Sequence, residues 1–74
     1  MNKLNNRERL LIEGGRVVHR HGLSATSVRD IATAAGVPLG SFSNHFPSKG
    51  AFGLEVLERY RTRSEAEVRE NFAQ

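Results

Sequence analysis

Apolar residues recur three and four positions apart between residues 7 and 21, which is the spacing of one face of an α-helix. The positions on this stripe are Leu10, Leu11, Gly14, Val17 and Val18. We expect this first helix to end at Gly22, because glycine adopts a left-handed backbone at a helix end without steric cost. Positive charge in the last turn, from His19 to His21, suits the negative end of the helix dipole.

Two adjacent glycines, Gly14 and Gly15, lie inside this helix. Each should cost about 1 kcal/mol relative to alanine in a helix interior. Either another helix crosses closely at this point, or the first helix is weak. Because Gly14 lies on the apolar stripe and Gly15 lies off it, a crossing helix would approach the first helix at Gly14.

A second helix is predicted over residues 28–34, with Val28, Ile31 and Ala32 turned inward. The residues Ser27 and Asp30 have the spacing of a capping box, in which the serine oxygen and the acid each accept a backbone N–H.

A third helix is predicted to follow the short break at residues 35–37. Pro38 suits the first helical position, where its missing N–H is no loss. This helix should carry Phe42 and Phe46 into the core and stop before Pro47. Two short helices joined by a tight turn containing glycine describe a helix-turn-helix.

A fourth helix is predicted to be capped by Ser48, with one face formed by Phe52, Val56, Leu57 and Tyr60. Charge dominates residues 59–74, and the pairs Glu55–Arg59 and Glu65–Arg69 have the i, i+4 spacing that supports an exposed helix.

A thin apolar stripe of Val68 and Phe72 has no evident partner within these 74 residues, which suggests a piece of a longer protein. The expected fold is therefore all-α: a three-helix bundle with a homeodomain-like helix-turn-helix and the start of a fourth helix.

Composition narrows the class of protein. With 74 residues, of which 38% are hydrophobic, the chain can form one modest core but not a core and a roomy ligand cavity. It has no cysteine, so disulfides and thiolate metal sites are excluded, and we expect neither a metal nor a cofactor. No apolar run has the length of a signal peptide or a membrane span, so we expect a cytoplasmic protein without membrane contact.

The net charge is +3, and the first fifty residues are distinctly basic. An anionic polymer is a suitable partner for such a surface, although an ordinary solvated surface explains an excess of this size almost as often.

A family resemblance sharpens this picture. It rests on the runs Thr26-Ser27-Val28-Arg29-Asp30-Ile31-Ala32, Ala35-Gly36-Val37, Gly40-Ser41-Phe42, Asn44-His45-Phe46 and Ser48-Lys49. This ordered set resembles the amino-terminal domain of the TetR family of transcriptional repressors, over residues 7–60. The resemblance implies a helix-turn-helix DNA-binding domain over residues 1–60 and, over residues 61–74, a connecting helix toward a regulatory and dimerisation domain that these 74 residues do not include.

The resemblance also implies the partners. These are double-stranded DNA with a near-palindromic operator, a second copy of the full-length protein in a homodimer, and a small-molecule effector that binds only to the other domain.

Base contacts are expected from the first turn of the recognition helix, which lies in the major groove. On this sequence these residues are Pro38, Leu39 and Gly40. Family members often carry a polar or basic residue where Leu39 stands. Its side chain could press on a thymine methyl group or be merely exposed. Arg29 matches a position that can reach a base, and a guanidinium is the commonest reader of guanine.

Phosphate contacts are expected from hydroxyl, imidazole and ammonium groups. The candidates are Thr26, Ser27, Ser41, Ser43, His45 and Lys49, and Asn44 joins the expected DNA-binding residues as part of the matching motif. Lys49 is the best of them, because a cation at the start of a helix is unfavourable for structural reasons alone. Ser27 is expected to act first as a helix cap, and His45 can alternatively cap the third helix. Ser43 stands where the family usually has tyrosine, and its shorter stem suits phosphate less well.

An enzyme and a protein-interaction module are the two alternatives to a DNA-binding protein. An enzyme is disfavoured, because His19 and His21 point to opposite sides of a helix. Ser41, Ser43 and His45 also lack the strand-turn-helix elbow of a nucleophile. A small helical protein-interaction module, using Val68 and Phe72, is the alternative to DNA binding.

Overall fold

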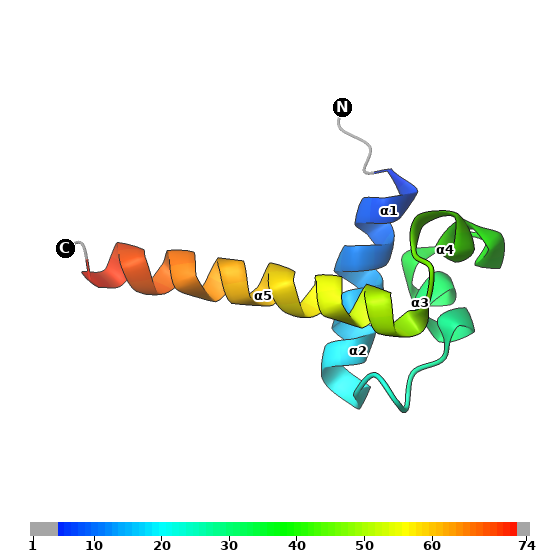
Figure 1. The fold of residues 1–74 in the computed structure, drawn as a ribbon, viewed down its shortest axis with the longest axis horizontal. Coiled ribbons are helices and arrows are strands. Elements are labelled where there is room, and N and C mark those ends of the chain that lie inside the picture. Colours follow the sequence, from blue (N-terminus) through cyan, green and yellow to red (C-terminus); the bar gives the residue numbers. More distant parts are fainter. Residues whose placement is uncertain (1–4, 73–74) are drawn as a thin grey trace.

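The protein is all-helical in the computed structural model, which describes the backbone of residues 5–72 and the side chains of residues 5–62. The element order is α1 (Asn6–Arg9), η1 (Leu10–Gly14), α2 (Gly15–His21), α3 (Val28–Ala35), α4 (Leu39–His45) and α5 (Lys49–Phe72). The first three run on as one helix that crosses α5, while α3 and α4 lie beside this crossing and α5 projects away from them (Figure 1). The predicted all-α class is confirmed.

The first helix begins one residue before the predicted start. The side chain of Asn5 accepts a hydrogen bond from the backbone N–H of Glu8 at 2.8 Å and so caps α1. The middle segment η1 is a π-helical turn, in which each hydrogen bond encloses one more residue than in an α-helix. Gly22 ends the helix with φ of +88°, as predicted.

The two glycines lie where α3 and α5 pack closely against the first helix. A β-carbon on Gly14 would meet Ile31 of α3 and Phe52 of α5, and one on Gly15 would lie 3.4 Å from Cγ1 of Val56. Of the two alternatives for the glycine pair, the close crossing is therefore the one present, and it lies at Gly14. Gly15, expected off the apolar stripe, is also buried, because α5 covers its side of the helix.

The helix-turn-helix forms as its capping residues predict. The hydroxyl of Ser27 accepts from the backbone N–H of Asp30 at 3.0 Å, and the Asp30 carboxylate accepts from the N–H of Ser27 at 3.1 Å. This is the predicted capping box. At the other end of α3, Gly36 adopts φ of +71°, and Val37 donates its N–H to the carbonyl of Ala32 at 3.1 Å. Gly36 also donates its N–H to the carbonyl of Thr33 at 3.1 Å, and these two hydrogen bonds close the helix in a Schellman motif.

Pro38 differs slightly from its predicted place. Its backbone is extended, with ψ of 150°, so it precedes α4 as the N-cap residue, and Leu39 is the first helical residue. Its carbonyl accepts from the N–H of Ser41 at 3.0 Å. The proline therefore sets the direction in which α4 leaves the turn.

Three phenylalanines form the centre of the core. Phe42 and Phe46 of the third predicted helix pack on Phe52 of α5 with ring centroids 5.4 and 5.0 Å away. Around them lie the other buried apolar side chains, Leu10, Leu11, Ile31, Ala32, Ala35, Val37 and Val56. The predicted roles of both phenylalanines, Ile31 and Ala32 are confirmed, and Val28 packs half-buried against this cluster.

The long helix α5 begins as predicted, with the hydroxyl of Ser48 accepting from the N–H of Ala51 at 3.0 Å. Its predicted apolar face is wrong in one part. Phe52 and Val56 are buried, but Leu57 is 64% exposed, and Tyr60 lies at the edge against the ring of His19. The first helix packs on Phe52 and Val56 and leaves Leu57 uncovered, so the buried face of α5 is narrower than predicted.

The predicted Glu55–Arg59 pair within α5 is also wrong, because both residues pair with the first helix instead. The side chains of Glu65, Val68, Arg69 and Phe72 lie outside the described residues.

Candidate nucleic-acid interface

The outer face of α4 is free of core contacts. Its inner face places Phe42 in the core, and the residues between those turns point outward. Leu39, Gly40, Ser43 and Asn44 are exposed, with Leu39 at 44% of its full exposure. A β-carbon on Gly40 would meet nothing within 4 Å. The face therefore offers two polar side chains, one leucine and a bare backbone to a ligand.

The start of α3 carries an exposed basic group. Arg29 stands in the first helical turn and is exposed, whereas Ile31 and Ala32 of the same helix are buried. The helices α3 and α4 pack on each other across the three-residue turn of Gly36–Pro38, and Arg29 lies at the end of α3 away from that turn. Ser27, just before it, is exposed and already serves as the helix cap.

Ser41 is half-buried at the side of α4. Its hydroxyl oxygen accepts a hydrogen bond from the amide Nδ2 of Asn6 on α1, at 3.0 Å. A serine hydroxyl keeps its own proton when it accepts, so Ser41 can still donate to a phosphate oxygen. Asn6 thereby orients a residue expected at DNA, and sequence spacing gave no signal of this contact because the two residues are 35 positions apart.

Thr26 does not suit its predicted contact. Its side chain is 2% exposed, and its hydroxyl donates to the carbonyl of Gly22 at 2.7 Å. The hydroxyl closes the turn between α2 and α3. Because it is buried and donates within the protein, it does not suit a contact with phosphate.

Lys49 has a structural role that the helix-dipole argument did not foresee. Its Nζ donates to the carbonyl of Thr26 at 3.1 Å and so ties the start of α5 to the turn before α3. The carbonyl is a compensating negative partner next to the positive end of α5. An ammonium has three N–H donors, so one bond to Thr26 leaves donors for a phosphate.

His45 ends α4 and is exposed beside Phe46. Together with Ser43 and Asn44 it forms a polar edge at the carboxyl end of the recognition helix. Of the residues expected to bind DNA, Thr26 is buried, and the others are exposed or half-buried on α4, in the segments flanking it and at the start of α3: Ser27, Arg29, Pro38, Leu39, Gly40, Ser41, Ser43, Asn44, His45 and Lys49.

The capping box changes the acidity of Asp30. The backbone N–H and the hydroxyl of Ser27 hydrogen-bond to the Asp30 side chain and lower its pKa. The ionised Asp30 carboxylate holds the capping box closed. It also places one negative charge next to Arg29 in the sequence, and this charge weakens the electrostatic attraction between Arg29 and a phosphate.

Other kinds of site receive no support in the described part of the chain. Residues 5–62 contain no group of three or more potential metal ligands. Within the described residues, no helix combines the length and apolarity of a membrane span.

Comparison with known proteins gives a consistent result. Residues 10–56 match the family described as bacterial regulatory proteins, tetR family. The HTH-type transcriptional repressor DhaR of Mycobacterium sp. (strain GP1) is 48% identical over 54 residues, which cover 73% of this chain and 27% of that protein. NemR of Escherichia coli (strain K12), also an HTH-type transcriptional repressor, is 39% identical over the same shares.

A third relative, the HTH-type transcriptional repressor KstR2 of Rhodococcus jostii (strain RHA1), is 41% identical over 78% of this chain and 28% of its own length. The chain thus matches about a quarter of the length of these relatives. No solved structure gave a significant match.

Proposed function

Because the chain belongs to the TetR family of bacterial regulatory proteins, as a helix-turn-helix DNA-binding domain of transcriptional repressors, we propose that it reads an operator by placing α4 in the major groove. The observation that carries this assignment is the uncommitted outer face of α4 (Leu39–His45). Its inner face is fixed to the core by Phe42, so the outer face is presented rigidly. A rigid helix end with free polar groups suits base edges.

Base reading is divided between the two helices. Leu39 and Gly40 enter first at the amino end of α4, where Leu39 contacts a thymine methyl and the bare Gly40 allows close approach of the backbone. Asn44 stands one turn further along the same face and can pair with adenine. Arg29, exposed at the start of α3, reads guanine or binds the adjacent phosphate.

Phosphate contacts hold the domain in register on the duplex. The hydroxyls of Ser27, Ser41 and Ser43, the imidazole of His45 and the ammonium of Lys49 supply the donors. The Asn6–Ser41 hydrogen bond supports this role, because it presents the Ser41 hydroxyl in one orientation.

The whole regulator would act as a repressor in the cytoplasm, as a homodimer on a near-palindromic operator. Each recognition helix would read one half-site, with half-site centres about 34–36 Å apart or a multiple of this. The part of such a regulator outside the matched segment would hold the two copies together and bind a small effector. Transcriptional regulation is not an enzymatic function, and the protein-interaction alternative is not favoured by family membership.

Selection of duplexes from a random pool tests the proposal. We expect a recurring sequence to emerge, and a mobility shift on that duplex that is stronger than on a scrambled one and weakens steeply with salt. Asn44→Ala should relax the base preference at one position of the site. A chain that binds selected and scrambled duplexes equally at every salt concentration would refute sequence-specific reading.

A further inference from the structure

The first turn of α1 contacts both the recognition helix and the long helix. Asn6 donates to Ser41 on α4. Its neighbour Arg7 places Nη2 at 2.6 Å from both carboxylate oxygens of Glu55 on α5. The same guanidinium lies over the ring of Phe46, with Cζ 4.9 Å from the ring centroid. Arg7 therefore touches the residue that directly follows α4 and a residue nearly two turns into α5.

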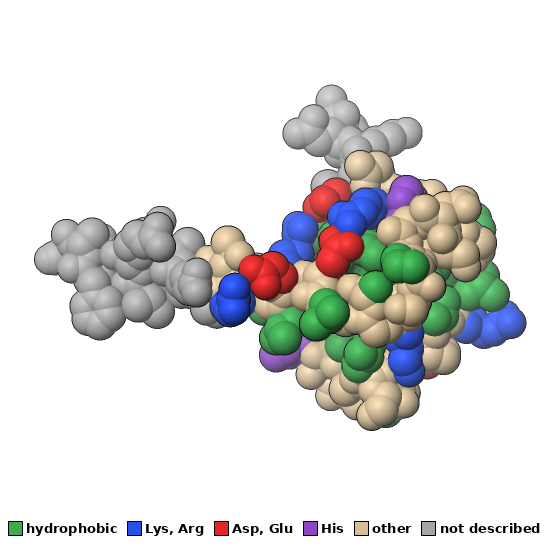
Figure 2. All heavy atoms as spheres, in the orientation of Figure 1, with side chains coloured by type: hydrophobic (Ala, Val, Ile, Leu, Met, Phe, Trp, Pro, Cys, Tyr) green, Lys and Arg blue, Asp and Glu red, His purple; other side chains and the backbone are tan. Residues whose placement is uncertain are grey.

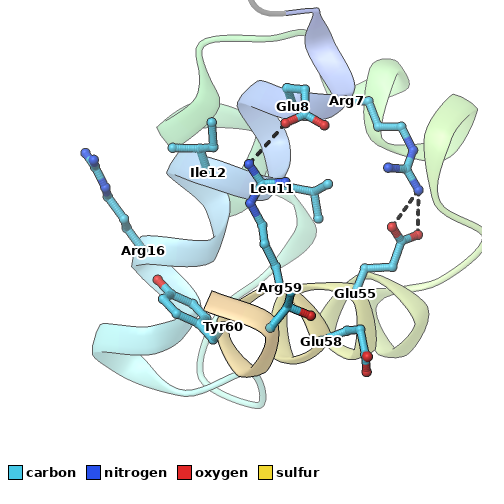
Figure 3. Close-up of a pocket in the computed structure, with 10 residues that line it drawn as sticks. Arg7, Glu8, Leu11, Ile12, Arg16, Glu55, Glu58, Arg59 and Tyr60 are labelled. Atoms are coloured by element: carbon cyan, nitrogen blue, oxygen red, sulfur yellow. Dashed lines mark hydrogen bonds and ion pairs between the residues drawn. The ribbon is translucent and has the colours of Figure 1, made fainter. Parts of the chain in front are cut away.

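A second ion pair joins the same turn to α5. Glu8 forms an ion pair with Arg59, with Oε1 and Nη2 3.1 Å apart. Figure 3 shows the two pairs bridging the groove between α1 and α5, and Figure 2 shows acidic and basic side chains gathered on this side of the molecule.

The two pairs have opposite polarity, and this arrangement defines a register. Arg7 on α1 meets an acid on α5, while Glu8 on α1 meets a base one helical turn further along α5. A slide of α5 by one turn would bring Arg59 toward Arg7. Such juxtaposition of like charges is unfavourable, so the alternating pairs favour one position of α5 over its neighbours.

We propose that Arg7 is a positioning residue for DNA binding, which fixes the carboxyl end of the recognition helix relative to α5 through Phe46 and Glu55. The inference rests on the proposed function of α4. The Arg7 and Glu55 side chains retain 39% and 43% of their exposure, and partly exposed ion pairs contribute little to folding stability. Their larger effect is on the orientation of the groups they join.

A direct phosphate contact by Arg7 is the competing explanation, and substitution of its partner separates the two. Glu55→Gln removes a negative charge from α5 and leaves Arg7 free. General electrostatics and a direct phosphate contact both predict tighter binding to any duplex. The positioning role predicts the opposite for the selected duplex, where affinity should fall about two- to fivefold, while binding to a scrambled duplex does not weaken.

Glu58→Gln is the matched control. It removes the same charge from the same helix, but Glu58 pairs only with Arg61 of α5, at 3.1 Å, among the described residues. We expect this variant to bind both duplexes as tightly as the unsubstituted chain or more tightly. The comparison is made with the 74-residue chain below the thermal transition of every variant, so that only folded protein is measured.

A swapped pair provides the rescue. Arg7→Glu combined with Glu55→Arg restores the link between α1 and α5, and we expect selected-duplex affinity to recover part of what either single change loses. In parallel, the backbone amide resonances of residues 39–45 should shift in Glu55→Gln but not in Glu58→Gln, although Glu55 lies on another helix.

Equal behaviour of Glu55→Gln and Glu58→Gln in affinity and in these resonances would overturn the positioning role. If the unsubstituted chain itself does not prefer the selected duplex, the proposed function fails and the amide resonances alone still decide whether the Arg7–Glu55 pair orients α4.

Discussion

The backbone of Gly14 packs directly against the side chain of Ile31, so that a β-carbon at Gly14 would lie 2.5 Å from Cγ2 of Ile31. Ile31 is fully buried and branched at Cβ, so it has little freedom to give way. The first helix and α3 can approach this closely because residue 14 has no side chain. Phe52 closes the same site from α5, at 3.1 Å from the added carbon.

We therefore expect Gly14→Ala to lower the free energy of unfolding by about 1–3 kcal/mol, because overpacking outweighs the helix-propensity gain of about 1 kcal/mol. Gly15→Ala is the matched control, since its added carbon would touch Val56 at ordinary contact distance. It should be neutral or stabilising by up to about 1 kcal/mol. Urea unfolding of both variants measures this, and equal stabilisation by both would contradict the close crossing.

Lys49 should affect both stability and DNA binding. Lys49→Ala removes the bond to the Thr26 carbonyl and should cost about 1 kcal/mol of unfolding free energy. If Lys49 also neutralises a phosphate, the slope of log K against log salt should become shallower by about one, on specific and non-specific duplexes alike. Titration at several salt concentrations measures the slope. A loss of stability with an unchanged slope would assign Lys49 to the fold alone.

Asp30 should make the stability of the chain depend on acid pH. Hydrogen bonds from Ser27 lower the pKa of Asp30 below its ordinary value of 3.8 in the folded state. The ionised form is therefore favoured by folding, and its contribution is present above that ordinary value and is lost as pH falls through the lowered pKa. In Asp30→Asn, which keeps an acceptor oxygen but does not titrate, part of the acid destabilisation should disappear. Thermal melts from neutral pH to pH 2 compare the two chains. If the melting temperatures of both chains fall equally as the pH is lowered, this assignment is refuted.

Leu39 should discriminate thymine by its methyl group. Replacing the contacted thymine by uracil removes that methyl, and Leu39→Ala removes its apolar partner, so each change should weaken binding of the selected duplex severalfold. The two changes together should weaken binding little more than either change alone, because both remove the same contact. Leu54→Ala, on an exposed leucine of α5, is the control and should leave affinity unchanged. Additive effects of uracil and Leu39→Ala would show that Leu39 does not contact the thymine methyl group.

Local signals predicted the helix-turn-helix well. The capping box of Ser27 and Asp30, the left-handed Gly36 and the i, i+4 pair of Phe42 and Phe46 each act within a few residues, so the sequence order alone defines them. The two glycines in the first helix indicated either a close crossing or a weak helix, and only the structure distinguishes these, in favour of the crossing at Gly14.

Contacts between distant segments were not predictable in this way. Glu55 and Arg59 have a spacing that favours a pair within α5, yet they pair with Arg7 and Glu8 because the first helix lies across α5. The same crossing leaves Leu57 uncovered. The apolar spacing of the first helix fits a regular period of 3.6 residues, so it does not predict the π-helical turn over Leu10–Gly14. For DNA contacts, spacing could nominate Thr26 but could not show that its side chain is buried.

The two faces of α4 carry separate tasks, and this separation bears on how such a domain can change its target during evolution. Substitutions at Leu39, Ser43 or Asn44 touch no core side chain, and changes at exposed positions of this kind usually alter stability by less than about 0.5 kcal/mol. A lineage carrying this domain can therefore drift toward a new operator by altering the outer face while Phe42 keeps the helix in place. Recognition can diverge without passing through unstable intermediates.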